Sequence, residues 1–303
     1  MAWDHERPQK KPSKLGHETG WRRELEGAGY IPNPKRVPVR GAVSLDDLSV
    51  QQLASRALDR CAAAASAWTV HGIQEHVTRI ITEAGVRATP EALCEVVAMT
   101  TRLAAEDWLS VLPPGSVQPG HVAYLTSLHV VAVETRLRDM LASRASVGAR
   151  QVPDVVRLGH RRLLDPEQAQ AASAVASTDP LVVVEGAAGA GKTAMLGVAI
   201  EAAAAEGRVT RVVTPTKKAA DVAHQELGVP TDSVAKLVHE HGWRWNRDGV
   251  WTRLNPSDTD PETGATYTGP AAGARLVRGE RIVVDEAGML DQDTALAVLT
   301  VAD

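Results

Sequence analysis

A short glycine-rich segment constrains the fold of this chain more than any other part of its sequence. Residues 186–193 read Gly-Ala-Ala-Gly-Ala-Gly-Lys-Thr, a complete G-x-x-x-x-G-K-[ST] pattern. The apolar, β-branched run before it, residues 180–185, is typical of a strand buried on both faces. The alanine-rich run after it, residues 194–205, favours a helix. A strand, a glycine-rich turn and a helix in this order predict a phosphate-binding loop.

The residues of this loop suit a nucleoside triphosphate. Gly186, Gly189 and Gly191 let the backbone approach phosphates and adopt positive φ. Amides at the start of the following helix point at the β-phosphate, where the helix dipole favours negative charge. Lys192 is expected to reach the β- and γ-phosphates, and the Thr193 hydroxyl to ligate Mg²⁺. ATP with Mg²⁺ is therefore the predicted cofactor, and the residues predicted to bind it here are Gly186, Gly189, Ala190, Gly191, Lys192 and Thr193.

Length and composition limit the class of protein. With 303 residues, 44% of them hydrophobic, the chain can bury a sizeable core and is expected to hold more than one domain. Its net charge of −4 excludes a polycation. The two cysteines, Cys61 and Cys94, lie far apart in apolar helical patterns, which predicts buried free thiols in a reducing compartment. Without an 18-residue apolar stretch or a signal-peptide pattern, the sequence predicts a cytoplasmic protein with no membrane insertion.

Two segments precede the loop domain. Residues 1–43 are basic and proline-containing and are expected to be disordered, either as a solvated tail or as a DNA-binding arm. Residues 44–160 are predicted to form an all-α module, because apolar residues recur at helical spacing over 50–61 and again over 73–84. A further helix is predicted over 125–145. No residue of this module carries recognisable chemistry, so its task stays open.

From residue 161 to residue 303 the pattern changes to alternating strands and helices. Strands are predicted at 181–185, 209–213 and 281–285, which indicates an α/β fold, a partial RecA-like P-loop NTPase domain with a parallel sheet. Residues 243–275 interrupt the alternation and are predicted to be a small β-rich insertion, with a hairpin followed by a long loop.

A pair of carboxylates is predicted to complete the nucleotide site. The strand that ends the α/β pattern delivers Asp285 to its C-terminal edge, where parallel sheets bind ligands. Asp285 is expected to hold Mg²⁺ through water, and Glu286 to orient and deprotonate the water that attacks the γ-phosphate. Lys192 and Glu286 are therefore the predicted catalytic residues. The alternative is a strand that merely ends in two solvated carboxylates.

Three smaller features extend this prediction. Gln168 lies 18 residues before the loop, where an amide can bond both edges of adenine. A segment after the second strand combines hydroxyls, lysines and a helix start, which suit a nucleic-acid backbone. The tryptophans around the predicted hairpin either stack on single-stranded DNA or form a small aromatic core. The residues of the second and third features are Thr214, Pro215, Thr216 and Lys217, and Trp243, Trp245 and Trp251, respectively.

Together these motifs resemble the RecD-like branch of superfamily 1 helicases. Residues from about 44 onward are similar to the internal region of MobF-type conjugative relaxases (the TraA/TrwC family). In that family an N-terminal transesterase nicks plasmid DNA and an ATP-driven helicase unwinds it 5′ to 3′, so the implied partners are single-stranded DNA and the plasmid-transfer machinery. The resemblance implies that Gln168 reads adenine, that Lys192 and Thr193 form motif I, that Thr214, Pro215 and Thr216 form motif Ia, and that Asp285 and Glu286 form motif II.

Two departures from the family limit the expected activity. The relaxase His triad and nucleophilic tyrosine have no counterpart here, so no nicking activity is expected. Motif III and the second RecA-like domain, with its charge-stabilising arginines, would lie beyond Asp303. We therefore expect ATP–Mg²⁺ binding with little or no turnover by this chain alone. The alternatives are a non-enzymatic docking module for DNA or protein with a vestigial ATP site and, more weakly, a P-loop kinase.

The resemblance also predicts a gap in the sheet. In the family, the strand after motif II lies between the strand entering the phosphate loop and the strand ending at Asp285. Both strands are expected to lack this neighbour here and to expose unpaired backbone groups. We interpret the chain as a gene fragment or truncated paralogue whose α/β half is at best marginally folded.

Overall fold

The computed structural model of the chain describes residues 23–25, 27, 29, 43–106, 109–113, 116, 122–145, 152, 155, 158–159, 162–187 and 189–303. Residues 44–303 form a unit of their own, separate from residues 1–43. The basic leader predicted over residues 1–43 falls almost entirely outside the described residues. None of the described helices combines the length and apolar character needed to cross a membrane.

The larger unit begins with a group of packed helices, as the apolar periodicity predicts. Each of the three long helices starts at a Ser or Thr whose side chain accepts a hydrogen bond from a backbone amide, namely Ser49, Thr69 and Thr89. Their apolar faces share one core, which includes the fully buried Ile73 and Val77. The elements are the 3-10 helix η2 (Leu45–Asp47) and the helices α2 (Val50–Ala64), α3 (Val70–Ala84) and α4 (Pro90–Ala104).

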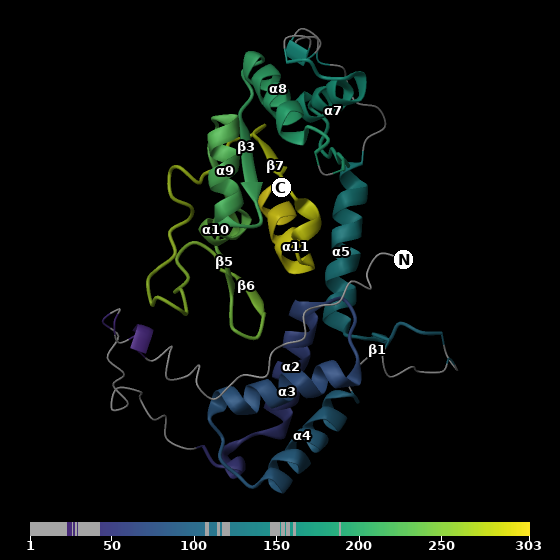
Figure 1. Cartoon of the computed structure of the whole chain (residues 1–303), viewed down its shortest axis with the longest axis vertical. Coiled ribbons are helices and arrows are strands. Elements are labelled where there is room, and N and C mark those ends of the chain that lie inside the picture. The colour runs from purple at the N-terminus through teal and green to yellow at the C-terminus, as the bar shows by residue number, and fades with distance from the viewer. Residues whose placement is uncertain are drawn as a thin grey trace. The chain divides into compact units, whose positions relative to one another are not determined.

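A short antiparallel pair and a long helix follow. Strands β1 (Leu109–Ser110) and β2 (Leu125–Thr126) pair with each other. Helix α5 (Leu128–Arg144) lies where the sequence predicts a helix, although it starts three residues later because residues 125 and 126 are taken up by β2. It runs beside the last helix of the chain, α11 (Gln292–Val301) (Figure 1).

The second half of the unit is an α/β fold, which confirms the predicted fold class. Its sheet has the order β4-β3-β7, and both pairings are parallel. The central strand β3 is the most protected, since Val212 and Val213 are fully buried. The elements are α7 (Pro166–Ala176), α8 (Lys192–Ala205), β3 (Thr210–Thr214), α9 (Lys217–Leu227), β4 (Thr231–Ser233), α10 (Val234–Glu240), β5 (Trp243–Trp245), β6 (Trp251–Arg253), β7 (Arg281–Val284) and the 3-10 helix η3 (Ala287–Met289).

The strand predicted at residues 181–185 is wrong. These residues are described, but they belong to no sheet, and the side chain of Val183 is 82% exposed. Among the described strands, β7 pairs only with β3, so its other edge is free. An apolar, β-branched segment becomes a strand only when a neighbour takes its amides and carbonyls. The expected gap in the sheet is therefore present, and residues 181–185 form no strand because they have no pairing partner.

The start of this unpaired segment is nevertheless anchored. Arg208 and Arg281 both donate to the carbonyl of Ser177, at 2.8 and 2.6 Å, and Arg281 also donates to the carbonyl of Asp179 at 2.8 Å. Burial and the nearby Arg208 lower the pKa of Arg281. The approach to the phosphate loop is thus tied to β7 by side chains, although no backbone ladder joins the two.

The predicted hairpin is confirmed. β5 and β6 are antiparallel, with Trp245 opposite Trp251 and the turn in between. The loop that follows is held by a buried ion pair between Arg244 and Asp260, whose Nε and Oδ2 atoms are 2.6 Å apart. The hydroxyl of Tyr267 donates to the carbonyl of Glu240 at 2.8 Å, which joins this loop to α10.

Candidate functional site

The glycine-rich loop has the backbone conformation that a phosphate-binding loop needs. Gly189 and Gly191 adopt φ values of +79° and +71°, in the left-handed region that favours glycine. Gly191 is the N-cap of α8 and provides no side chain to cap it. The first amides of α8, beginning at Lys192, are therefore free to meet an anion, and the helix dipole favours negative charge there.

Lys192 lies folded over its own loop. Its ammonium donates to the carbonyls of Gly186 and Ala187, at 3.0 and 3.2 Å. These two carbonyl oxygens take the place that phosphate oxygens would have around the ammonium. Lys192 can therefore bind a nucleotide by exchanging neutral acceptors for charged ones, a change that strengthens each hydrogen bond.

Gln168 contacts the glycine-rich loop. Its amide nitrogen donates to the carbonyl of Ala190 at 3.0 Å, and its amide oxygen accepts from the backbone of Asp165 at 3.0 Å. Asp165 and Gln168 form a reciprocal capping box at the start of α7. A Cβ atom on Gly191 would lie 2.7 Å from the Gln168 amide nitrogen, so this contact requires glycine at 191. The structure thus places Gln168 as a brace of the loop, and its predicted reading of adenine remains a prediction.

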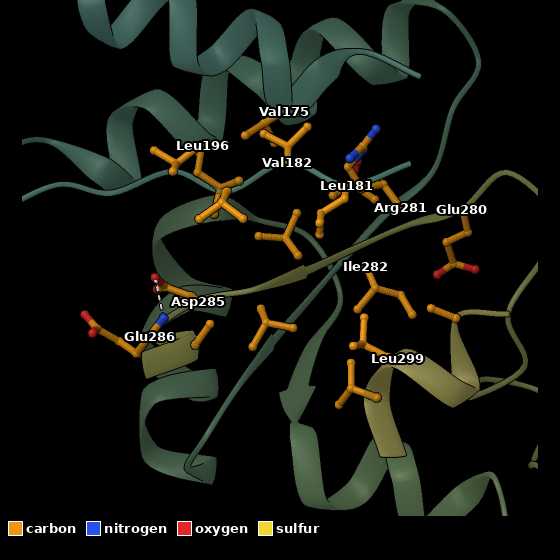
Figure 2. A pocket seen from close by; sticks show the side chains of 18 of the residues that line it. Val175, Leu181, Val182, Leu196, Glu280, Arg281, Ile282, Asp285, Glu286 and Leu299 are labelled. Carbon is orange, nitrogen blue, oxygen red and sulfur yellow. Dashed lines mark hydrogen bonds between the residues drawn. The ribbon is translucent and has the colours of Figure 1, made fainter. Parts of the chain in front are cut away.

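Asp285 and Glu286 follow β7 directly. The backbone amide of Asp285 donates to the carbonyl of Val213 at 3.0 Å, which extends the ladder with β3 by one bond. Its carboxylate accepts from the amide of Glu286, also at 3.0 Å (Figure 2). Glu286 has a φ of +56° and a ψ of 40°, a left-handed conformation that strains a residue other than glycine. This strained turn aims two carboxylates away from the sheet edge.

One cavity of about 1930 Å³ is lined both by the start of α8 and by the residues that follow β7. The phosphate-loop residues Lys192 and Thr193 line it together with Asp285 and Glu286. The rest of its lining mixes apolar with charged side chains and includes residues of β7 and of the unpaired segment (Figure 2). The apolar lining residues labelled in Figure 2 are Val175, Leu181, Val182, Leu196, Ile282 and Leu299.

The comparison with known proteins agrees with this geometry. Residues 163–303 match the family model of an AAA domain. The match supports a helicase-like P-loop ATPase domain in this segment. The matched range begins before Gln168 and includes both the glycine-rich loop and the Asp285–Glu286 pair. No curated protein matches the chain in sequence.

The AAA domain uses most of its predicted nucleic-acid residues for its own structure. Thr214 is 1% exposed and donates its hydroxyl to the carbonyl of Thr216 at 2.8 Å. The Thr216 side chain caps α9. Lys217 is exposed and pairs with Asp221 at 3.0 Å, which raises the pKa of Lys217. Among these side chains, that of Lys217 can contact a phosphate by giving up its exposed ion pair with Asp221, without breaking a contact of the buried core.

The tryptophans of the AAA domain form a small aromatic cluster. Trp245 stacks on Trp251 with ring centroids 4.7 Å apart, and Trp243 meets Trp251 edge-on at 6.1 Å. Trp243 and Trp251 also pack against the buried core beneath α10 and α11. Trp245 is the most exposed of the three, at 37%. The packing of Trp243 and Trp251 favours the aromatic-core interpretation for these two partly buried residues, and Trp245 is left as the exposed member of the cluster.

Within the described residues no cluster of three or more His, Cys, Asp or Glu side chains could hold a metal by itself. The predicted Mg²⁺ ligands Thr193 and Asp285 supply two oxygen atoms on the same cavity. Mg²⁺ usually takes few protein ligands and completes its shell with water and phosphate oxygens, so this donor set fits it.

Proposed function

We propose that the chain binds ATP with Mg²⁺ at the phosphate loop of its AAA domain, as the ATP-binding part of a conjugative relaxase-type DNA helicase. The observation that carries the nucleotide part is the shared cavity of the free α8 N-terminus, Lys192, Asp285 and Glu286. A donor-rich helix start and two carboxylates on one cavity are groups that would bind a triphosphate, and Thr193 and Asp285 would hold the Mg²⁺ that polarises it.

Each residue has a distinct part in this proposal. Lys192 exchanges its two loop carbonyls for β- and γ-phosphate oxygens. Thr193 and Asp285 hold Mg²⁺, which neutralises part of the phosphate charge. Glu286, on its strained turn, accepts the proton of the attacking water. Gln168 keeps the loop in place from α7.

The helicase part of the proposal rests on the resemblance and on the position of Lys217. The exposed Lys217 at the start of α9 suits a backbone phosphate of single-stranded DNA. Hydrolysis also needs the transition-state charge neutralised, and an arginine from another domain is worth about 10³–10⁵ in rate. We therefore expect tight binding with little turnover, and we expect coupling to DNA only in an assembly that adds such an arginine.

Equilibrium binding of a fluorescent ATP analogue tests the nucleotide site. Lys192→Ala is expected to weaken Mg²⁺-dependent binding by at least about tenfold, since it removes charged hydrogen bonds. Lys236→Ala is the matched control, because Lys236 on α10 pairs with Asp232 of β4 and does not line the cavity. Equal binding by the Lys192→Ala variant and the unaltered chain would overturn the proposal. Unwinding of a tailed duplex by the isolated chain would contradict the expectation of low turnover.

The alternative function, a docking module with a vestigial ATP site, has its own signature. Capture of DNA or of a transfer-machinery protein would then survive Lys192→Ala unchanged. If the function depends on ATP, Lys192→Ala would lose the capture of these partners together with nucleotide binding.

A further inference from the structure

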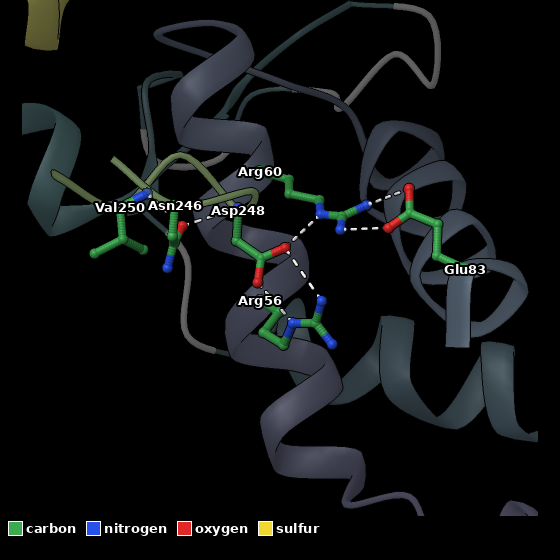
Figure 3. Close-up of polar contacts among 6 residues, drawn as sticks. All are labelled: Arg56, Arg60, Glu83, Asn246, Asp248 and Val250. Atoms are coloured by element: carbon green, nitrogen blue, oxygen red, sulfur yellow. Dashed lines mark hydrogen bonds and ion pairs between the residues drawn. The ribbon is translucent and has the colours of Figure 1, made fainter. Parts of the chain in front are cut away.

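The turn of the β5–β6 hairpin is seated on the α2 helix, far away in sequence. The carboxylate of Asp248 accepts from the Nε of Arg56 at 2.7 Å and from the Nε of Arg60 at 2.6 Å (Figure 3). Arg60 turns its other nitrogens to Glu83 of α3, at 2.7 and 3.1 Å. The Asp248 carboxylate of the AAA domain therefore lies between the guanidinium groups of Arg56 and Arg60, both on α2.

Burial makes this contact more than a surface ion pair. The side chains of Arg60 and Asp248 are 9% and 13% exposed. Burial by itself raises the pKa of Asp248, but the hydrogen bonds from Arg56 and Arg60 outweigh it and lower that pKa. Exposed pairs contribute little to stability, whereas removing one partner of a buried pair leaves a costly uncompensated charge. The Asp248 carboxylate is therefore stabilised in its position between Arg56 and Arg60.

The backbone of the turn is shaped for the same approach. The Asn246 side-chain oxygen accepts from the amides of Asp248 and Val250, at 2.9 and 3.1 Å, which holds the turn rigid. Gly249 has a φ of +80°. A Cβ atom there would lie only 2.2 Å from the Cβ of Ala63 on α2. A hairpin turn needs glycine for its φ, but the contact with Ala63 is a separate requirement that only docking imposes.

The hairpin connects this contact to the interior of the AAA domain. Trp243 and Trp251, on either side of the turn, pack against the core that includes Val238 of α10 and Val298 of α11. A turn fixed on α2 therefore fixes the strands that carry the Trp245–Trp251 stack.

We propose that the turn at residues 246–250 is a clasp, by which the α2–α3 helices hold the aromatic hairpin of the AAA domain in one docked position. Opening the clasp frees the hairpin while the sheet stays folded. This device is separate from nucleotide binding and gives the helical part of the chain a task. It goes beyond the proposed function and does not depend on it.

Hydrogen exchange followed by mass spectrometry on the full chain tests the clasp. Asp248→Asn keeps the shape of the side chain but removes the charge that both arginines bind. Exchange at the amides of residues 243–253 is expected to rise by about tenfold or more. Exchange in β3 and α8 is expected to stay unchanged. Glu75→Gln is the control, because it breaks the exposed Glu75–Arg79 pair on α3 and leaves the clasp intact.

A steric pair of variants tests the same contact without charge. Gly249→Ala places a methyl group against Ala63 and is expected to release the hairpin. Ala63→Gly in the same chain removes the collision but not the φ strain, so it is expected to restore part of the protection. Unchanged exchange at residues 243–253 in Asp248→Asn, an equal rise throughout the AAA domain, or no rescue by Ala63→Gly would each overturn the proposal.

Discussion

Gln168 donates its side-chain amide to the carbonyl of Ala190, 3.0 Å away, so the first helix of the AAA domain braces the phosphate loop directly. The brace crosses 22 residues of sequence and passes next to Gly191, whose missing side chain makes room for it. The shape of the loop therefore depends on α7 as well as on its own glycines.

The brace predicts a measurable effect on nucleotide binding. Gln168→Ala is expected to weaken ATP–Mg²⁺ binding by about tenfold, because it removes one hydrogen bond to the loop and one within the capping box. Gln170→Ala, two residues further along the exposed part of α7, is the control and is expected to bind as the unaltered chain does. Titration of a fluorescent ATP analogue measures both. Equal affinities for the two variants would show that the contact does not support the loop.

The strained conformation of Glu286 predicts a gain of stability on its removal. Glu286→Gly is expected to raise the free energy of unfolding by about 1 kcal/mol, since glycine adopts a φ of +56° without strain. The same variant removes the carboxylate expected to activate water, so any ATP hydrolysis falls to background. Glu226→Gly within α9 is the comparison, and it is expected to cost about 1 kcal/mol. Urea unfolding measures the free energy of unfolding of both variants. A loss of stability in Glu286→Gly would show that the backbone of Glu286 is not strained.

The two cysteines are expected to differ in reactivity. Cys61 is buried in the helical core, and burial raises the pKa of its thiol to about 12, with a smaller contribution from Glu75. Cys94 is exposed, which differs from the expectation that both thiols are buried. At pH 8 a thiol reagent is expected to modify one cysteine in the folded chain and two in denaturant, and Cys94→Ser removes the fast reaction.

The raised pKa of Cys61 also predicts a loss of stability in alkali. Its folded pKa lies above its unfolded value, so the folded state binds this proton more tightly. The resulting stability is complete below about pH 8.5 and is lost as the pH rises toward the folded pKa of about 12. Cys61→Ala is expected to flatten this dependence in urea melts at pH 8 and pH 10. A variant that loses stability as steeply as the unaltered chain would rule out Cys61 as the source.

The proposed contact of Lys217 with nucleic acid predicts a salt effect. Lys217→Ala is expected to weaken single-stranded DNA binding and to reduce the slope of log K against log salt by about 0.7, the value of one phosphate contact. Arg79→Ala, an exposed cation of α3, controls for a general loss of charge. Fluorescence anisotropy over a salt series measures both. An unchanged slope for Lys217→Ala would remove this residue from the proposed interface.

The parts of the fold that were predicted correctly depend on nearby residues. The helices over 50–61 and 73–84, the turn at Asp248-Gly249 and the glycine loop are encoded within a few residues, so sequence patterns can identify them. The strands β3 and β7 were found for a similar reason, because their β-branched runs lie next to each other in the sheet and satisfy each other's backbone groups.

The parts that were missed depend on residues far apart in the chain. Residues 181–185 have the composition of a buried strand, but the free edge of β7 is not paired with them, so they form no strand. The brace from Gln168 and the clasp at Asp248 were missed because their partners, Ala190 and the two arginines of α2, are identified only once the helices are packed.

The phosphate loop, the carboxylates at the end of β7 and the α/β class could be predicted from the amino-acid sequence, because each follows from short-range backbone preferences and from the chemistry of a few adjacent side chains. Packing settled whether residues 181–185 join the sheet, what Gln168 and Thr214 bind, and where the hairpin is held. Each of these depends on a hydrogen-bond or ion-pair partner brought close by packing, and a pattern along the chain carries no information about such a partner.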